Sequence, residues 1–270
     1  MAFVPPLTQD EIEAAVGGLR AIRSLGEGGQ GCVWLAEASD GSPAALKVYA
    51  RRDNVQVRVE REVEALRDLR CDSIVELVDW GQTQIRGEDC VYTLTGYIDG
   101  PNLHELLGAG QLAESRVVRV CQRIAQAIDA MWALRIVHRD VKPENIVVAR
   151  DGSVFLIDLG IAKHLDKTTL TLYGRVWGTP GYMSPEQMAG RPGLTLRSDL
   201  FSLGIVAYEA VSGSHPFGGR QDLIGRVDPP HVRDRCGVSA RVASSIHWLL
   251  KARPVDRPSS GAALIADLSE

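Results

Sequence analysis

The pattern of apolar residues changes at Gly100-Pro101, and this change constrains the fold more than any other feature of the sequence. The part before it contains strand-like segments and one helical stripe, whereas most of the part after it has helical spacing. Such a change within 270 residues predicts an α+β protein of two lobes, a small β-rich lobe with one helix and a larger, mainly helical lobe. A cleft is expected at the junction, where ligand sites are favoured.

The expected elements of the small lobe are short. Five segments have the composition of strands: residues 20–25, 32–38, 44–49, 74–80 and 91–97. Asp40-Gly41 predicts a hairpin turn, and apolar residues at helical spacing predict a helix within residues 55–69. In front of the lobe, Thr8 and Glu11 form a capping-box pattern that predicts a short helix, packed on the domain and ending at about Val16.

The larger lobe is expected to contain a long helix within residues 113–134, where apolar residues form a continuous stripe. Two short strands are predicted on either side of the turn at Asp151-Gly152. From Ser198 onward the pattern is mostly helical.

The composition excludes several classes of protein. A formal net charge of −4 gives no general attraction to nucleic acid or to an anionic membrane. Five scattered cysteines without a C-x-x-C pair argue against a disulfide framework or a zinc site. No apolar run is long enough to span a membrane, and the first residues lack the pattern of a secretory signal. A cytoplasmic protein without nucleic-acid or membrane partners is therefore expected.

Residues 138–145, His-Arg-Asp-Val-Lys-Pro-Glu-Asn, place a carboxylate, a cation and an amide within one short stretch of backbone. These groups suit phosphoryl transfer, which requires a base that directs a hydroxyl, charges that neutralise the moving phosphoryl group, and a magnesium ion. Asp140, Lys142 and Asn145 supply them in that order. Asp158, which follows an apolar strand, adds a second oxygen donor of the kind that magnesium prefers.

A glycine-rich segment and a lysine provide candidate contacts to phosphate. Gly26, Gly28 and Gly31 fit the pattern G-x-G-x-x-G, which dinucleotide-binding turns share, but those turns continue into a helix and here a strand follows. The glycines instead predict a flap whose backbone N–H groups approach phosphate oxygens. Lys47 lies within an apolar strand and requires a charged partner, for which Glu62, on the inward face of the next helix, is placed.

Together these motifs resemble those of eukaryotic-type (Hanks-type) serine/threonine protein kinases, in the form also found in bacteria, from about residue 19 to residue 268. Residues 178–186, Gly-Thr-Pro-Gly-Tyr-Met-Ser-Pro-Glu, are similar to the end of an activation segment. The resemblance implies that Asp199 braces the catalytic loop and that Arg257 pairs with Glu186. It also implies the two-lobed kinase fold, with a flanking helix within residues 1–18, an N-lobe at 19–97 and a C-lobe at 98–270.

The resemblance further implies roles around ATP. Lys47, held by Glu62, would contact the α and β phosphates beneath the glycine flap, and Asp158 and Asn145 would bind Mg²⁺, with Mn²⁺ as an alternative ion. The residues expected around adenine are Leu25, Val33, Ala45, Val147, the backbone of Gly96 and Ile98, and Thr95 as the gatekeeper. Four apolar or aromatic residues match the stack that aligns the lobes of active kinases: His138, Leu159, Leu66 and Leu77.

Regulation is also implied by the resemblance. Arg139, directly before the catalytic aspartate, is typical of kinases controlled by phosphorylation of the activation loop, and Lys163 is positioned to join it in a basic pocket. Within residues 163–179 we expect autophosphorylation of Thr171 or Thr169, less readily of Thr168, through a transient homodimer, followed by binding of the phosphate to that pocket.

The expected function is ATP- and Mg²⁺-dependent transfer of the γ-phosphoryl group to serine or threonine hydroxyls of protein substrates. The alternative is a pseudokinase, a scaffold that binds nucleotide or partner proteins, but such chains usually lack the base, a metal ligand or the strand lysine. A small-molecule kinase of the aminoglycoside type would more often lack the threonine-bearing segment. Two departures from the family pattern are Leu159 in place of phenylalanine and Cys71-Asp72-Ser73 in place of His-Pro-Asn, which leaves the geometry of that turn open.

Overall fold

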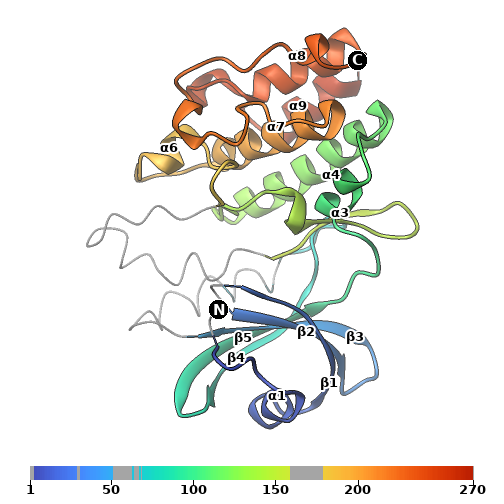
Figure 1. The fold of residues 1–270 in the computed structure, drawn as a ribbon, viewed down its shortest axis with the longest axis vertical. Coiled ribbons are helices and arrows are strands. Elements are labelled where there is room, and N and C mark those ends of the chain that lie inside the picture. Colours follow the sequence, from blue (N-terminus) through green and yellow to red (C-terminus); the bar gives the residue numbers. More distant parts are fainter. Residues whose placement is uncertain are drawn as a thin grey trace. The chain divides into compact units, whose positions relative to one another are not determined.

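The computed structural model (Figure 1) describes residues 3–28, 31–50, 63, 67, 69–158 and 179–269. These residues fall into two compact units. The small unit comprises the described residues up to 67 together with 75–98, and the large unit comprises 69–74, 99–158 and 179–269. The predicted α+β class is confirmed, because the small unit is built on one sheet and the large unit is mainly helical.

Five antiparallel strands in the order β1-β2-β3-β5-β4 form the sheet of the small unit. Their bounds are β1 Leu19–Gly28, β2 Gly31–Ala38, β3 Pro43–Ala50, β4 Leu77–Ile85 and β5 Glu88–Gly96. The predicted turn at Asp40-Gly41 joins β2 to β3, and Gly41 adopts a φ of 81°, which glycine reaches without strain. Each predicted strand is present, although β4 begins at Leu77 rather than at Ile74.

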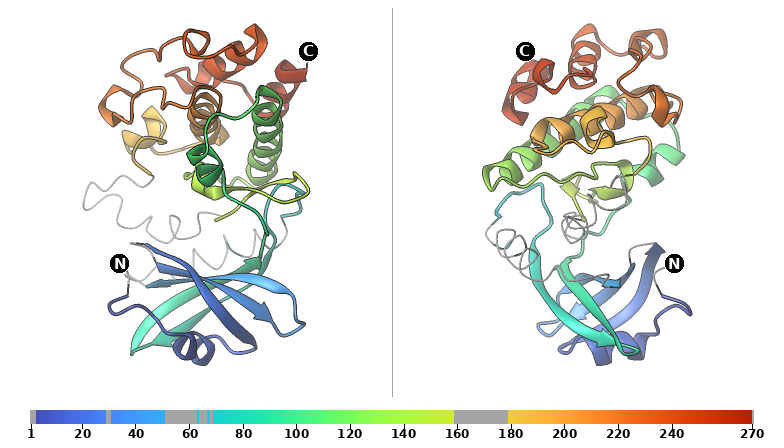
Figure 2. Two further views of the ribbon diagram at one scale, coloured as in Figure 1. Left: turned by 45° about the vertical axis from the view of Figure 1, so that its right-hand side comes forward. Right: turned by 90° about the vertical axis from the view of Figure 1, so that its left-hand side faces the viewer.

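One face of the sheet packs on the N-terminal segment, whose helix α1 (Gln9–Ala15) lies against β1 and β4 (Figure 2). Alternate side chains of the strands are buried on this face: Cys32, Trp34, Ala36, Ala44, Leu46, Val48 and Leu94. Ile12 of α1 is fully buried against them, with Phe3, Leu7 and Val16 on either side of it in the sequence. The predicted capping box at Thr8 and Glu11 is confirmed.

Arg86, in the turn between β4 and β5, ties the N-terminal segment to the sheet. Its guanidinium donates to both carboxylate oxygens of Glu11, at 2.7 and 2.9 Å, and to the backbone carbonyls of Pro5 and Pro6, at 2.7 and 3.1 Å. Arg86 and Gly87 both have positive φ, as two-residue hairpin turns that follow the twist of the strands require. The hydrogen bond from Arg86 and that from the Thr8 backbone lower the pKa of Glu11 to about 2.

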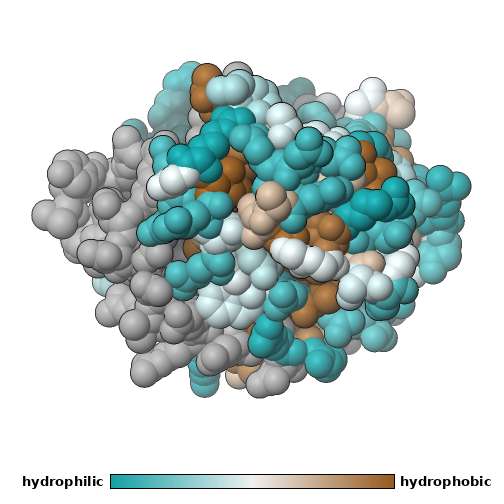
Figure 3. All heavy atoms as spheres, turned by 90° about the horizontal axis from the view of Figure 1, so that it is seen from below, coloured by the Kyte–Doolittle hydropathy of each residue, from teal (hydrophilic) through white to brown (hydrophobic). Residues whose placement is uncertain are grey.

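The surface of the small unit leaves few large apolar side chains in water. On the face shown in Figure 3, apolar side chains lie between hydrophilic ones. Among the described residues of this unit, the exposed large apolar side chains are Val4, Ile22, Leu25 and Val78. Burial against the N-terminal segment therefore accounts for much of the apolar surface of the sheet.

Helices α4 (Glu114–Ala133) and α7 (Leu196–Ser212) form the centre of the large unit, and α7 is buried along almost its whole length. The apolar stripe of α4 packs against α7 and α9 (Gly261–Ser269), while α8 (Ala240–Leu249) packs on α7 and α9. The remaining helical elements are α3 Leu103–Gly108, η1 Pro143–Asn145, α6 Pro185–Met188, η2 Gln221–Leu223, η3 Val232–Asp234 and η4 Pro254–Asp256. The predicted strands around Asp151-Gly152 are β6 (Ile146–Val148) and β7 (Val154–Leu156).

The turn at residues 71–74 explains the late start of β4. It is closed by a hydrogen bond from Ile74 N to Cys71 O at 3.0 Å, and Leu156 N donates to Ser73 O at 2.8 Å. Ile74 therefore forms an isolated bridge with Leu156 instead of joining the sheet of the small unit. The helix predicted within residues 55–69 lies almost entirely outside the described residues and stays a prediction.

Candidate active site

Asp199, near the start of α7, holds the backbone of the loop at residues 138–145. Its two carboxylate oxygens accept hydrogen bonds from the backbone N–H groups of His138 and Arg139, each at 2.8 Å. Asp199 is buried, so these charge-assisted bonds are shielded from water. Arg139 has a φ of 66°, a left-handed conformation that persists only where the surroundings support it. The contact that the sequence resemblance implied for Asp199 is present.

The carboxylate of Asp140 is buried and has partners on both oxygens. Thr179 donates to Oδ1 from its backbone N–H at 3.2 Å and from its hydroxyl at 2.8 Å. Oδ2 lies 3.5 Å from Nζ of Lys142 and accepts a hydrogen bond from Nδ2 of Asn145 at 3.2 Å. Lys142 also donates to the Thr179 hydroxyl at 2.9 Å. These contacts fix the direction of the carboxylate, as a base that aims a hydroxyl requires.

Asn145 lies in this loop, and the chain just before Asp158 is hydrogen-bonded to it. Nδ2 of Asn145 donates to the backbone carbonyl of Asp140 at 2.9 Å as well as to its carboxylate, which leaves the amide oxygen for a cation. The backbone carbonyl of Asn145 accepts from Ile157 N at 2.9 Å, one residue before Asp158. Amide and carboxylate oxygens suit Mg²⁺, which usually takes one or two protein ligands and completes its shell with water and phosphate. Within the described ranges, no group of three His, Cys, Asp or Glu side chains is arranged to hold a metal ion.

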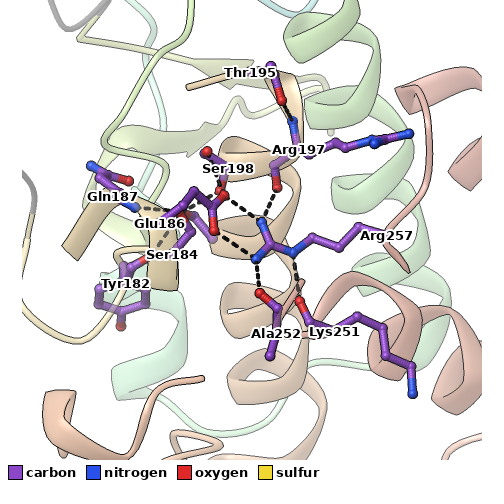
Figure 4. Close-up of polar contacts among 11 residues, drawn as sticks. Tyr182, Ser184, Glu186, Gln187, Thr195, Arg197, Ser198, Lys251, Ala252 and Arg257 are labelled. Carbon is purple, nitrogen blue, oxygen red and sulfur yellow. Dashed lines mark hydrogen bonds and ion pairs between the residues drawn. The ribbon is translucent and has the colours of Figure 1, made fainter. Parts of the chain in front are cut away.

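A buried ion pair anchors Glu186, at the end of the segment that begins with Thr179 (Figure 4). Arg257 donates to the two carboxylate oxygens of Glu186 at 2.7 and 2.9 Å. The side-chain exposures of Arg257 and Glu186 are 0% and 8%. Three backbone carbonyl groups accept the remaining guanidinium hydrogens, at 2.7 to 2.8 Å: those of Lys251, Ala252 and Arg197.

The charge state of Glu186 follows from these contacts. Burial alone raises the pKa of the carboxyl group, but the hydrogen bond and charge of Arg257 and the hydroxyl of Ser198, at 2.7 Å, outweigh it. The pKa of Glu186 is therefore held below its usual range. The pair that the resemblance implied between Arg257 and Glu186 is present and charged at neutral pH.

Three contacts of residues 179–187 were missed by the sequence analysis. They are the bonds from Thr179 to Asp140, the bond from the Tyr182 hydroxyl to Glu209 at 2.6 Å, and the bond from Gln187 Nε2 to the Arg139 carbonyl at 2.8 Å. Burial raises the pKa of the Tyr182 hydroxyl above its usual range, and Glu209 adds to the effect. The partners are 27 to 48 positions apart, so no local pattern could have indicated them.

The second face of the small sheet carries the residues predicted to bind the nucleotide. In the strand register, Lys47 pairs with Val33 on one side and Thr93 on the other, and Ala45 pairs with Thr95. Because side chains alternate along a strand, these residues share the face opposite the buried core. Each of the predicted residues on this face is partly exposed: Val33, Ala45, Lys47 and Thr95. The ammonium of Lys47 also lies 4.9 Å from the centre of the Tyr49 ring.

The glycine-rich segment forms an antiparallel hairpin between β1 and β2. Gly26 pairs with Val33, and Gly28 pairs with Gly31, so a strand and not a helix follows the third glycine. A side chain at Gly31 would overlap the backbone carbonyl of Val48, which explains why glycine is required there. Leu25 in β1 is exposed, while Gly96, the last residue of β5, and Ile98 are partly exposed.

The remaining predicted residues divide into two sets. Val147 is buried in β6 of the large unit, as are Asp140 and Asn145 in their loop. Seven predicted residues lie outside the described part of the chain, and their roles stay predictions: Glu62, Leu66, Leu159, Lys163, Thr168, Thr169 and Thr171.

Comparison with known proteins decides the family. Residues 19–267 match the protein kinase domain. The chain belongs to this family. The Hanks-type, bacterial-like membership predicted from the motifs is confirmed, and with it the two-lobed kinase fold.

The kinase domain is similar to several bacterial proteins. It is 37% identical to the serine/threonine-protein kinase Pkn1 of Myxococcus xanthus, over 92% of this chain and 37% of that protein. It is 33% identical to the serine/threonine-protein kinase pkn3 of the same organism (90% and 48%), and 36% identical to the probable serine/threonine-protein kinase PkwA of Thermomonospora curvata (80% and 29%). The chain thus spans less than half the length of these relatives. Within its described residues, no helix has both the length and the apolar character needed to cross a membrane.

Proposed function

We propose that the kinase domain transfers the γ-phosphoryl group of ATP to serine or threonine hydroxyls of protein substrates. The observation that carries the proposal is the buried carboxylate of Asp140, held between Thr179 on one oxygen and Lys142 and Asn145 on the other. A carboxylate fixed in this way suits a base that directs a substrate hydroxyl. The names of the relatives, all serine/threonine-protein kinases, support the same class of reaction.

In the proposed reaction, Asp140 accepts a hydrogen bond from the substrate hydroxyl and takes its proton as the new O–P bond forms. The bond from the γ-phosphorus to the β–γ bridging oxygen breaks at the same time and ADP leaves. Lys142 places a positive charge beside the transferred group, and its bond to Thr179 holds it there. The amide oxygen of Asn145 and the carboxylate of Asp158 would hold Mg²⁺, or Mn²⁺ in its place. ATP would supply the phosphoryl group, and the metal ion would supply positive charge beside its phosphates.

The small unit supplies the proposed nucleotide contacts. Lys47, paired with Glu62, binds the α and β phosphates beneath the flap of Gly26, Gly28 and Gly31. The shared sheet face supports the adenine assignment of Val33, Ala45 and Thr95, because it presents them beside Lys47. Further proposed adenine contacts come from Leu25, Val147 and the backbone of Gly96 and Ile98.

Regulation is proposed to act through residues 163–179. Autophosphorylation of Thr171 or Thr169, less readily Thr168, would give a phosphate that binds Arg139 and Lys163. The proposed setting is a cytoplasmic kinase domain with an N-lobe at residues 19–97 and a C-lobe at 98–270, acting on protein substrates and forming a transient homodimer for autophosphorylation.

Incubation with radiolabelled ATP and Mg²⁺ tests the proposal. We expect label on the protein itself and on a generic basic protein substrate, and we expect Asp140→Asn to abolish both. Asp222→Asn, which removes an exposed aspartate paired with Arg220, is the matched control and should keep full activity. Nucleotide binding without any transfer by the natural chain would overturn the proposal in favour of a scaffold.

A further inference from the structure

Two histidine rings of the large unit stack beside a surface hollow that the proposed reaction does not use. His231 directly precedes η3 and His247 lies in the last turn of α8. Their ring centres are 4.6 Å apart and their planes are inclined by 18°. Both rings line a hollow of about 460 Å³, together with Asp228, Arg233, Ser244, Leu250 and Lys251. All of these residues come from one short stretch of the sequence and belong to one unit.

Backbone hydrogen bonds fix the proton positions on both rings. His247 Nε2 accepts from the N–H of Val232 at 3.1 Å, and His231 Nδ1 accepts from the N–H of Arg233 at 3.4 Å. A ring nitrogen that accepts carries no proton, so each neutral ring carries its proton on the other nitrogen. Neither of those N–H groups has an acceptor within the described residues. The stacked rings therefore leave two N–H donors for a ligand.

The charged groups of the hollow favour an anion. Arg233 and Lys251 are exposed and form no ion pair within the described ranges, and Asp228 is the one carboxylate among the lining residues. Two permanent cations thus outweigh a single acid. Arginine and lysine beside neutral N–H donors match the oxygens of a tetrahedral dianion.

We propose that this hollow binds a small molecule through a phosphate monoester group. Its volume lies within the range of small-molecule sites, about 300–1,000 Å³, and its lining joins apolar Leu250 to the polar groups that would hold the phosphate. The ligand would accept hydrogen bonds from the two ring N–H groups and from Arg233 and Lys251. This site lies apart from Asp140 in the sequence and does not depend on the catalytic proposal.

The surroundings of His247 predict that binding is coupled to proton uptake. Burial lowers the pKa of His247, and the neighbouring His231 and Lys251 lower it further, while Asp228 and Asp234 oppose them. The added proton goes on Nε2 of His247 and displaces the bond from the Val232 N–H, and the charge of a bound dianion offsets that loss. A bound dianion therefore raises this pKa, and the affinity rises as the pH falls through the histidine range. The other polar or charged groups near His247 come from α7 and from η3 and its flanks: Tyr208, Arg233 and Arg235.

Isothermal titration calorimetry with inorganic sulfate, inorganic phosphate and glycerol phosphate tests the site. Sulfate stays a dianion throughout the histidine range, so its pH dependence reports the protein alone. We expect Arg233→Gln and Lys251→Gln each to weaken binding about twofold to fivefold, as loss of one exposed charged donor implies. Arg241→Gln removes the same charge from α8 outside the hollow and should leave binding unchanged.

His247→Gln separates the pH effect from simple loss of a contact. Glutamine retains an oxygen acceptor for the Val232 N–H and an N–H donor, but it cannot take up a proton. Sulfate should bind the natural chain several-fold more tightly at about pH 5.5 than at about pH 7.5, and this difference should shrink in His247→Gln. A difference of equal size in the variant would overturn the coupling.

The remaining outcomes each decide the proposal. Tighter binding of glycerol phosphate than of inorganic phosphate supports a small phosphorylated ligand, whereas a phosphoserine peptide that binds more tightly still would overturn that choice of ligand. No saturable binding in the millimolar range, or sulfate binding that is unchanged in all three variants of the hollow, means an adventitious ion only and overturns the site. Because the readout needs no ATP, Asp140→Asn should bind like the natural chain, so failure here and failure of the catalytic proposal are distinguishable.

Discussion

Two arginine–glutamate pairs with the same hydrogen-bond distances lie in different surroundings. Arg257 in the large unit and Arg86 in the small unit each bind both oxygens of a glutamate, at 2.7 and 2.9 Å, and each also binds backbone carbonyl groups. The side chains of Arg257 and Glu186 are 0% and 8% exposed, whereas those of Arg86 and Glu11 are 32% and 31% exposed. Equal distances therefore do not imply equal loss of stability when a partner is removed, because water can replace the partner only in the small unit.

Arg257→Ala should have the largest effect, because it leaves the Glu186 carboxylate and three backbone carbonyls buried without their donor. We expect a loss of about 3–5 kcal/mol in the free energy of unfolding, measured by urea denaturation. Glu186→Gln, which removes the charge but keeps a polar side chain, should lower the free energy of unfolding less. It replaces Arg257→Ala in the measurement if that variant does not fold. Arg220→Ala, at an exposed pair, is the control, and an equal loss there would remove burial as the explanation.

Ile12→Ala tests how the N-terminal segment is held. The Ile12 side chain is fully buried against the sheet, so its truncation should cost about 2–5 kcal/mol of the free energy of unfolding. Val4→Ala, at a side chain that is 78% exposed, should have little effect in the same measurement. A similar loss for both variants would contradict the assignment of Ile12 to the core.

Arg86→Gln should destabilise the chain less than Ile12→Ala, because the Glu11 carboxylate regains water when its partner is removed. Part of the loss should persist in salt, since the bonds to the carbonyls of Pro5 and Pro6 do not depend on the charge of Glu11. Arg20→Gln, at the more exposed pair with Glu37, is the control for charge alone and should change the melting temperature less. A larger fall in melting temperature for Arg20→Gln than for Arg86→Gln would contradict a stabilising role of the Arg86 contacts.

The smallest expected effect is a pH dependence of the contribution that Arg86 makes to the free energy of unfolding. The pKa of Glu11 is lowered to about 2, so the stability gained from its ionised form is present above its ordinary pKa of 4.5 and is lost as the pH falls toward 2. The difference in unfolding free energy between the natural chain and Arg86→Gln should therefore be constant near neutral pH and decrease below pH 4.5. A difference that stays constant under acid conditions would show that the Glu11 bonds do not contribute.

Local patterns predicted those parts of the fold whose partners are close in the sequence. The capping box of Thr8 and Glu11 and the turn at Asp40-Gly41 each depend on residues a few positions apart, and both were predicted. The predicted start of β4 was wrong because Ile74 pairs with Leu156, a distant residue that no local sequence pattern indicates. The sequence predicted that the helix after Thr8 packs on the domain, but not that the N-terminal segment shares a core with Cys32, Trp34 and Leu46.

The candidate site shows the same division. Asp140, Lys142 and Asn145 lie in one loop, so their mutual contacts followed from spacing. Arg257 and Glu186 are 71 positions apart, and only the family resemblance indicated that they pair. Nothing in the sequence indicated that Thr179 would bind the Asp140 carboxylate. The two residues are 39 positions apart, and the path of the chain between them decides whether they meet.

The family match begins at Leu19, yet the core of the small unit includes Phe3, Leu7, Ile12 and Val16. A shortened chain that starts at the family boundary would leave the sheet side of Trp34 and Leu46 bare to solvent. Exposed apolar surfaces of this kind drive self-association. Such a fragment should therefore aggregate in solution, although every residue proposed for phosphoryl transfer is still present. If only residues 19–267 were expressed, an insoluble fragment could be taken for an inactive enzyme.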